Sequence, residues 1–403
     1  MTEQTNLVPK RRFKEFQNTH AWKQHKLGEI SNSFEYGLNA SATFFDGINK
    51  YIRITDIDDN SRLFNQSALT SPGVDLSNAD NYLIKNGDIL FARTGASVGK
   101  TYRYQESDGK VYYAGFLIRA RINQDFDSEF VFQNTLTPKY DNFIKITSQR
   151  SGQPGVNAQE YASFDLMVPT LEEQQKIGTF FKDLDGTIAL HQRKLEKTKA
   201  LKSAYLSEMF PAEGEREPKR RFAEFTQAWE QRKLGEVVNI TMGQSPNGVN
   251  YTENPDDHIL VQGNADIKNG WVVPRVWTTQ VTKSADKGDI ILSVRAPVGD
   301  VGKTQYDVVL GRGVAGIKGN EFIFQLLSKM KSNGFWTIYS TGSTFESINS
   351  NDLKEAIISI PEEAEQTKIG SFFKQLDETI ALHQRKLEKL QNIKKAYLNE
   401  MFV

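Results

Sequence analysis

The sequence repeats itself, and this duplication constrains the fold more than any other feature of the chain. The decapeptide IALHQRKLEK occurs at 188–197 and again, unchanged, at 380–389. The match extends from Lys176–Phe210 to Lys368–Phe402, with roughly three quarters of the positions identical. Two segments this similar are expected to fold and pack in the same way. We therefore expect two structurally equivalent halves.

A second repeated segment opens each half. PKRRFKEF at 9–16 corresponds to PKRRFAEF at 218–225, and each is followed by a Trp and then by KLGE. The stretches between the repeats differ in sequence, yet they keep sparse landmarks in the same order. These landmarks are GDIL (87–90) and GDII (288–291), Val98–Thr101 and Val301–Thr304, and Leu166–Pro169 and Ile358–Pro361. Each half is therefore predicted to be a variable body followed by a constant helix.

The two halves are circularly related. The first constant segment runs on into the PKRRF of the second half, whereas the second constant segment ends the chain and its matching PKRRF stands at the start. We therefore expect the two termini to meet in space and the fold to be a pseudo-two-fold ring. Two-fold pseudosymmetry within one chain matches the symmetry of duplex DNA.

Residues 172–210 and 363–403 are each predicted to form one long helix. Apolar residues in both segments follow alternating steps of four and three, which is the heptad signature of paired helices. The predicted seam consists of Ile177, Phe181, Leu184, Ile188 and Leu195 in the first helix and Ile369, Phe373, Leu376, Ile380 and Leu387 in the second. Neither helix can bury this stripe alone, so we expect the two to pair with each other. The pseudo-two-fold relation makes that pair antiparallel.

The two variable bodies are predicted to be α+β domains. Short strands are expected at Tyr51–Ile57, Asp88–Arg93, Gly115–Ile122, Ile259–Gln262 and Asp289–Val294, with one helix in each body at Glu129–Leu136 and Glu321–Ser332. The predicted division of the chain is an opening segment (1–30), a first body (31–171), a first spacer helix (172–210), a linker with the second opening segment (211–237), a second body (238–362) and a second spacer helix (363–403).

Composition limits the classes of protein to consider. The chain has no Cys, which excludes a disulfide framework and a thiolate metal site. The N-terminal segment has no apolar signal core, and no apolar run approaches membrane-spanning length, so we expect a cytoplasmic protein that does not enter the membrane.

The net charge is zero, which weighs against a nucleic-acid binder. Residues 31–170 carry 13 Lys and Arg against 16 Asp and Glu, and residues 238–362 carry 11 against 13. If these bodies bind DNA, their cations must be focused on one face or supported by a basic partner.

Several segments resemble catalytic or metal sites without meeting their requirements. Gly95–Thr101 has three residues between its glycines, whereas a Walker A loop has four, and the second copy has two. The acidic run of Asp56, Asp58 and Asp59 lacks the Gly and the final Glu of an EF-hand, so we interpret it as a solvated loop. His191 and His383 fall on the helix seam and are expected to be core residues. We also find no adenine-methyltransferase or HExxH signature. We therefore expect no catalytic residue, no metal and no cofactor in this chain.

The chain resembles the specificity (S) subunits of type I restriction-modification systems along essentially its whole length. The resemblance rests on two EQxKIGxFFxxLDxxI segments (Glu173–Ile188 and Glu365–Ile380) and on the two HQRKLEKxxxxKxAYLxEMF helices. The RFxxF…W openings and the GDI and VGK landmarks complete it. The family often has two prolines before Glu-Gln, whereas this chain has VPTLEEQ (168–174) and IPEEAEQ (360–366), a mild departure.

The resemblance implies a function and a set of partners. Each body is expected to be a target recognition domain that reads one half of a split, asymmetric sequence in double-stranded DNA. The helices are expected to space the two domains and to dock two methyltransferase subunits, which methylate adenine with S-adenosylmethionine. Two motor-nuclease subunits, which use ATP and magnesium, join for restriction. The S subunit has no enzymatic activity of its own, and its partners can share the phosphate contacts that the acidic bodies lack.

The residues themselves suggest where DNA is read. Base edges are recognised by Arg, Lys, Asn, Gln, Ser and Thr, and phosphates by Lys, Arg and small polar residues on loops. Both bodies carry such residues after the first landmark strand, after the GDI strand and before the last strand. The candidates are Arg53, Thr55, Arg93, Thr94, Ser97, Lys100, Arg150, Ser151, Gln153 and Asn157 in the first body, and Gln262, Asn264, Arg295, Lys303, Ser343, Thr344, Ser347 and Asn349 in the second. For each residue alone, a solvated loop position is the competing interpretation.

Two other functions remain open from sequence. A stand-alone nuclease or methyltransferase is disfavoured by the missing motifs. A coiled-coil adaptor that binds only protein needs nothing more than the two helices. The bodies diverge while the helices stay constant, and this contrast favours two readers of different targets over an adaptor.

Overall fold

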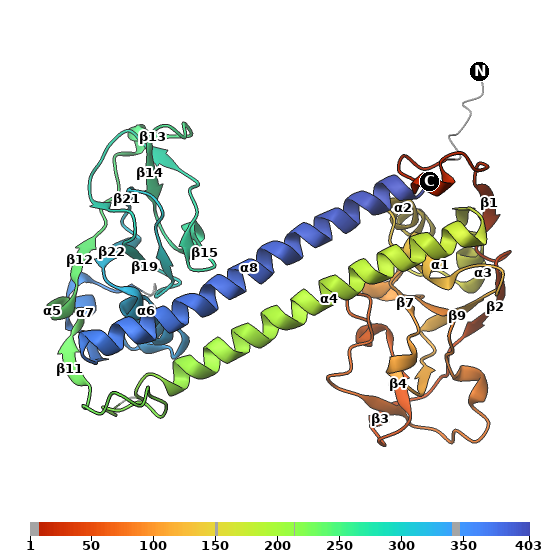
Figure 1. The fold of residues 1–403 in the computed structure, drawn as a ribbon, viewed down its shortest axis with the longest axis horizontal. Coiled ribbons are helices and arrows are strands. Elements are labelled where there is room, and N and C mark those ends of the chain that lie inside the picture. Colours follow the sequence, from red (N-terminus) through yellow and green to blue (C-terminus); the bar gives the residue numbers. More distant parts are fainter. Residues whose placement is uncertain (1–7, 150–151, 213, 341–346) are drawn as a thin grey trace. The chain divides into compact units, whose positions relative to one another are not determined.

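The computed structural model describes residues 8–149, 152–212, 214–340 and 347–403 (Figure 1). They fall into two compact units. Unit 1 contains Met1–Arg193 and Gln384–Val403, and unit 2 contains Lys194–His383. Each unit therefore holds one variable body, the first part of one long helix and the last part of the other.

The two long helices are α4 (Leu171–Glu208) and α8 (Glu363–Met401), as the heptad pattern predicted. In unit 1 the ring centroids of Phe180 and Tyr397 lie 5.2 Å apart, and Lys394 pairs with Asp185 at 2.6 Å. The residue numbers rise along α4, from Phe180 to Asp185, while those of their partners on α8 fall, from Tyr397 to Lys394. The helices therefore pack antiparallel.

Unit 2 repeats the same helix contacts with the roles of the helices exchanged. The ring centroids of Phe372 and Tyr205 lie 5.1 Å apart, and Lys202 pairs with Asp377 at 2.6 Å. The predicted seam residues divide into two groups. The buried group contains Ile177, Phe181, Leu195, Ile369, Phe373 and Leu387. The half-buried group contains Leu184, Ile188, Leu376 and Ile380.

The body of unit 1 is built on an antiparallel sheet of order β2-β9-β6-β7. Its strands are β2 (Ser31–Tyr36), β6 (Asp88–Ala92), β7 (Thr101–Arg103) and β9 (Leu117–Ile122). Smaller ladders pair β1 (Lys23–Lys26) with β10 (Asp165–Val168), β3 (Ala42–Phe44) with β5 (Thr70–Pro72), and β4 (Lys50–Ile52) in parallel with β8 (Val111–Tyr113). The helices are α1 (Ser128–Asn134), α2 (Pro138–Thr147) and α3 (Ala158–Ala162), and the 3-10 turns are η1 (Lys14–Phe16), η2 (Ile54–Asp56), η3 (Asp80–Tyr82), η4 (Gly95–Ser97) and η5 (Glu106–Asp108).

The body of unit 2 contains two larger sheets of order β12-β22-β19-β20-β16-β15 and β13-β17-β14-β21-β18. The strands of the first sheet are β12 (Asn239–Met242), β15 (Ile267–Lys268), β16 (Trp271–Val272), β19 (Ile290–Ser293), β20 (Val301–Lys303) and β22 (Val314–Lys318). Those of the second are β13 (Tyr251–Thr252), β14 (His258–Val261), β17 (Trp277–Thr278), β18 (Ser284–Ala285) and β21 (Val308–Leu310). A separate ladder pairs β11 (Glu230–Lys233) with β23 (Ile357–Ile360). The helices are α5 (Leu234–Val237), α6 (Glu321–Ser332) and α7 (Ser350–Glu355), with 3-10 turns η6 (Gly248–Asn250), η7 (Asn264–Asp266) and η8 (Phe335–Ser340).

Most elements predicted for the bodies are confirmed, and helix α6 has the predicted bounds. Its counterpart α1 ends two residues earlier than predicted. Both helices start at a polar cap, where Asp127 accepts a hydrogen bond from the Phe130 N–H (2.7 Å) and Asn320 accepts one from the Ile323 N–H (3.0 Å). The predicted strand at Tyr51–Ile57 is wrong beyond Ile52. There the Asp56 carboxylate accepts the Arg53 N–H at 2.9 Å and closes turn η2.

Strand register shows which residues of the two bodies are equivalent. The GDI landmarks occupy the same place, since β6 pairs Ile89 with Arg103 and β19 pairs Ile290 with Lys303. Lys303 is therefore equivalent to Arg103 and not to Lys100. The predicted match of Val98–Thr101 with Val301–Thr304 is wrong, because the similar letters lie three residues out of register.

The true counterparts in this loop are two glycines. Gly99 and Gly299 have φ values of 84° and 86°, a backbone conformation that glycine adopts without steric cost. The Gly99 N–H donates to the Ala92 carbonyl at 3.0 Å, and the Gly299 N–H donates to the Ser293 carbonyl at 2.8 Å. The loop therefore turns at the same point in both bodies although its lysine is not shared.

An aromatic cluster fastens each body to the long helices. In unit 1, Phe130 of α1 lies 5.7 Å from Trp22 and 5.3 Å from Phe402 between ring centroids, and Phe402 lies 5.6 Å from Phe181. In unit 2 the same arrangement is made by Phe322, Trp229, Phe210 and Phe373, at 5.5, 5.2 and 5.9 Å. Phe402 and Phe210, the equivalent residues of the two repeats, therefore form the same joint.

The first described residues of the chain lie beside the end of α8 in unit 1 (Figure 1), as the circular relation predicted. The Arg11 N–H donates to the Glu400 carbonyl at 2.8 Å. In unit 2 the equivalent bond runs from the Arg220 N–H to the Glu208 carbonyl, also at 2.8 Å. The N-terminal segment therefore caps the end of α8 as residues 218–225 cap the end of α4.

Candidate nucleic-acid interface

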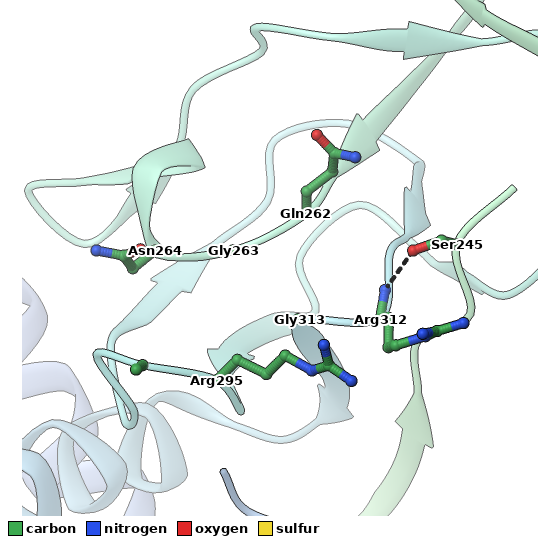
Figure 2. A pocket seen from close by; sticks show the side chains of 8 residues that line it. Ser245, Gln262, Gly263, Asn264, Arg295, Arg312 and Gly313 are labelled. Carbon is green, nitrogen blue, oxygen red and sulfur yellow. Dashed lines mark hydrogen bonds between the residues drawn. The ribbon is translucent and has the colours of Figure 1, made fainter. Parts of the chain in front are cut away.

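A polar cavity of about 430 Å³ lies in the second body, where several strands end (Figure 2). Gln262 follows β14, Arg295 comes shortly after β19, and Arg312 lies in the turn between β21 and β22. β14 and β21 are parallel neighbours, so their carboxyl ends open on the same edge of the sheet. The lining residues are Ser245, Gln262, Gly263, Asn264, Arg295, Ala296, Arg312 and Gly313.

A buried carboxylate fixes the loop that carries Gln262. Asp266 is 5% exposed, and it accepts hydrogen bonds from the backbone N–H groups of Gln262 (2.7 Å) and Gly263 (3.3 Å). Asp56 plays the same part in the first body, where it holds Arg53. Asp56 of the acidic run therefore caps a turn. Nowhere in the described ranges do three or more acidic or His residues gather as metal ligands.

Two glycines fix the position of Arg312. A Cβ on Gly313 would lie 2.1 Å from the Gln262 carbonyl oxygen, and one on Gly311 would lie 3.0 Å from that of Val261. The backbones therefore approach more closely than a side chain at Gly313 permits. The Arg312 N–H also donates to the Ser245 hydroxyl at 3.1 Å, the bond drawn in Figure 2. This rigid turn presents Arg312 beside Gln262.

Arg295 reaches the same cavity from the strand β19. Its backbone forms a β-bridge with Ser347, and the Ile348 N–H donates to the Val294 carbonyl at 2.9 Å. Figure 2 shows the Arg295 side chain running toward the Gly313–Arg312 segment. Both arginines are exposed, and neither forms an ion pair with any residue that the structure describes. The cavity thus combines two guanidinium groups with the amides of Gln262 and Asn264.

The same place in the first body has different chemistry. The ungapped match of GDILFART with GDIILSVR puts Thr94 where the second body has Arg295. The Gly37 N–H donates to the Leu117 carbonyl, and the Gly243 N–H donates to the Val314 carbonyl, both at 3.0 Å. Leu117 and Val314 are therefore equivalent, and Gly115, two residues before Leu117, corresponds to Arg312. Phe116, 60% exposed, stands next to it.

The cations of the first body lie close to this place but are engaged. Arg93 stacks over the Tyr36 ring, with its guanidinium carbon 4.9 Å from the ring centroid. Arg53 forms a two-pronged ion pair with Asp56, with both bonds at 2.8 Å. The backbone of Thr94 forms a β-bridge with Gly155. The Gln153 side chain lies against Gly95, since a Cβ built on Gly95 would be 2.9 Å from the Gln153 amide nitrogen. Three predicted residues, Arg93, Thr94 and Gln153, therefore lie along one edge.

The two landmark lysines have partners inside the protein. Lys100 is 8% exposed, and its ammonium donates to the Ile57 carbonyl at 3.0 Å and pairs with Asp59 at 2.6 Å. Lys303 pairs with Glu321 and lies 5.0 Å from the centroid of the Phe324 ring. These contacts hold loops and helices together in each body.

The remaining predicted residues are scattered. Asn157 and Asn349 cap the helices α3 and α7 by accepting backbone N–H bonds. Thr55 is exposed and Ser97 is half-buried. Arg150, Ser151, Ser343 and Thr344 lie outside the described residues. Sequence reasoning missed Ser245 and Arg312, although an arginine between two glycines was a signal that a tight turn presents it.

In each unit a chain of polar contacts runs from the strand β7 or β20 to both long helices. In unit 1, Arg103 of β7 pairs with Glu129 at 2.7 Å. The Gln133 amide donates to Glu129 (2.9 Å) and to Asp185 of α4 (3.0 Å), and Lys394 of α8 completes the chain at Asp185. Burial raises the pKa of the Glu129 carboxyl, and the nearby Arg103 opposes this rise. The same series of polar contacts exists in unit 2, where it runs through Lys303, Glu321, Gln325, Asp377 and Lys202.

Residues 20–200 and 226–392 match the model of one protein family, the type I restriction modification DNA specificity domain. The chain is 28% identical over 333 residues to a proposed specificity subunit of the type I restriction enzyme MjaX of Methanocaldococcus jannaschii, covering 79% of this chain and 78% of that protein. It is 20% identical to the specificity subunit of the type I restriction enzyme MjaVIII of the same organism, over 83% of this chain and 82% of that one.

Solved structures share the fold. A type I restriction-modification S subunit from M. genitalium matches with a TM-score of 0.70 at 13% identity, covering 98% of this chain and 99% of that one. A chain from a study of complex assembly in the type I system matches with a TM-score of 0.52 at 22% identity, over 94% and 97% of the two chains. Among the helices that the structure describes, none has the length and apolar character needed to cross a membrane.

Proposed function

This chain belongs to the type I restriction-modification DNA specificity family, and we propose that each of its bodies reads one half of a bipartite, asymmetric DNA target. As a member of this family it is a non-catalytic subunit that confers DNA specificity on a complex with methyltransferase and restriction subunits. The finer assignment concerns which parts of the chain do the reading. We assign it to the strand-end edges that carry Arg93, Thr94 and Gln153 in the first body and Gln262, Arg295 and Arg312 in the second.

One observation carries this assignment. The two bodies share a strand framework, two GDI turns and the joint to the helices, yet they differ in chemistry at the same edge. Thr94 and Gly115 in the first body stand where Arg295 and Arg312 stand in the second. Two readers of different sequences must differ where they touch base edges and agree where they are held.

The constant parts are assigned to assembly. The outer faces of α4 and α8 carry nearly the same sequence twice, so they suit two copies of one partner. We assign two methyltransferase subunits to these faces and two motor-nuclease subunits to the complete restriction complex. In this family the cofactors belong to the partner subunits. S-adenosylmethionine is assigned to the methyltransferase, and ATP and magnesium are assigned to the motor-nuclease.

Mapping of adenine methylation tests the proposal. Cells that carry this subunit with its methyltransferase should contain methylated adenines in one split, asymmetric sequence with a fixed gap. An uninterrupted motif, or two half-sites of the same sequence, would contradict two different readers. An adaptor that binds only protein would leave the methylated sequence unchanged when either body is replaced.

A further inference from the structure

The arginine pair in the cavity of the second body points to a specific base. Arg295 and Arg312 are exposed and have no acidic partner among the described residues. By contrast, most other cations near the two edges are engaged, such as Arg53 with Asp56 and Lys303 with Glu321. Both side chains line the same cavity, so their guanidinium N–H groups are available to an electronegative ligand that enters it.

The cavity is organised before a ligand arrives. The Gly311–Gly313 turn is pressed against the backbone of Gln262 and fixes the start of the Arg312 side chain. The Tyr251 hydroxyl accepts a hydrogen bond from the Gln262 amide at 3.1 Å, so that side chain is also oriented. Asp266 holds the loop beneath it. Such support is required for base reading, since hydrogen-bond recognition depends on tight placement of the donors.

The neighbours of the arginines favour a base edge over a phosphate. A phosphate offers only acceptor oxygens, so the amide carbonyl groups of Gln262 and Asn264 would find no donor on it. A base edge presents acceptors and donors side by side, which is what guanidinium and amide groups together can match. Arginine donates two parallel bonds to O6 and N7 of guanine, which is the commonest specific contact to DNA.

We propose that Arg295 and Arg312 read guanine in the half-site recognised by the second body. The inference rests on the proposed function and deepens it, because it names the bases. The first body has Thr94 and Gly115 at the matching positions, so it reads its own half-site with other groups. The two halves of the target should therefore respond independently when these arginines are changed.

The test uses the full chain with its methyltransferase and three variants, Arg312→Ala, Arg312→Lys and Arg295→Ala. The control is Arg232→Ala, an exposed arginine on β11 whose one ion pair among the described residues is with Glu236 at the surface. Two quantities are measured for each variant, the methylated sequence in cells and the affinity of the purified complex for its target. Thermal unfolding of each variant shows that it is folded.

The wild-type target should contain guanine in one half-site. Each alanine variant should accept other bases at a guanine position of that half only, and its affinity for the original target should fall about 5- to 150-fold. Arg312→Lys should relax the same position, because an ammonium cannot make the two-pronged contact. The control should leave the sequence and the affinity unchanged.

Three results would overturn the inference and leave the proposed function standing. They are a target without guanine in the half assigned to the second body, variants that keep the full motif, and a loss of affinity equal for all sequences that Arg312→Lys restores. The last result identifies a phosphate contact. The absence of any bipartite motif in the wild type would instead refute the proposed function itself.

Discussion

The buried ion pair between Arg12 and Glu173 should be the strongest single link between the N-terminal segment and α4. Both bonds of the guanidinium fork measure 2.6 Å, and the two side chains are 5% and 0% exposed. Glu173→Ala would leave Arg12 buried without its counter-charge. Breaking a buried pair in this way costs about 3–5 kcal/mol.

The same loss can be expressed as a melting temperature. Unit 1 contains 193 and 20 residues in its two segments, and for a domain of this size each kcal/mol shifts Tm by about 2–4 °C. We therefore expect Glu173→Ala to lower the Tm of unit 1 by about 6–20 °C. Trp22 is the only one of the five Trp residues that falls in unit 1, so ¹⁹F NMR of fluorotryptophan-labelled protein can follow that unit alone.

Two variants separate charge burial from other effects. Arg11→Ala removes the exposed pair with Glu400 and should leave Tm unchanged, since exposed pairs contribute little. Arg12→Met combined with Glu173→Leu leaves no charge buried and should recover most of the loss. If Glu173→Ala behaves like Arg11→Ala, or if the double variant is as unstable as Glu173→Ala, the pair is not the link described.

Further outcomes follow from the same contacts. A fragment ending at Phe210 should form a homodimer in sedimentation experiments, because Lys202, Tyr205 and Phe210 can replace Lys394, Tyr397 and Phe402 against unit 1 of a second copy; a folded monomer at micromolar concentration would contradict this. Gly178→Ala should destabilise the protein by about 1–3 kcal/mol in urea unfolding, because the new Cβ would lie 2.5 Å from the Asp127 carboxylate, whereas Gly186→Ala, with nothing within 4 Å, should stabilise it by up to about 1 kcal/mol. Lys100→Ala should leave the salt dependence of DNA binding unchanged, because the Lys100 ammonium is held by Ile57 and Asp59. If the slope of log K against log salt concentration fell by about one, Lys100 would be a phosphate contact after all. Adding seven residues after Leu195 and after Leu387 lengthens each helix by about 10 Å and should lengthen the gap in the methylated sequence by about three base pairs or abolish methylation, whereas unchanged activity with an unchanged gap would show that the helices do not set the spacing.

The architecture could be predicted because it is repeated and periodic. The heptad positions from Ile177 to Leu387 gave the helices and their pairing, and the displaced PKRRF segment gave the meeting of the termini. The joint residues Trp22, Phe130, Phe181 and Phe402 recur as Trp229, Phe322, Phe373 and Phe210. Repetition within one chain served as its own alignment.

The strand-end edges that we propose to read DNA could be predicted only in part. The match of Val98–Thr101 with Val301–Thr304 failed because four shared letters carry less information than the hydrogen-bond register of β7 and β20. The strand expected through Ile57 failed because an Asp side chain closed a turn after Ile52. The place of Arg312 in the cavity was not predicted, because it depends on the close approach of Gly313 to Gln262, two residues far apart in sequence. Which exposed cations have partners depends on tertiary contacts that the sequence does not display.

Exchange of one body tests the central claim most directly. Residues 31–170 would be replaced by the corresponding body of another family member, and the methylated sequence would be mapped before and after with the same methyltransferase. The account predicts that one half-site changes to that of the donor while the other half-site and the gap stay the same. A change in both half-sites, or in neither, would contradict the claim that each body reads one half of the target.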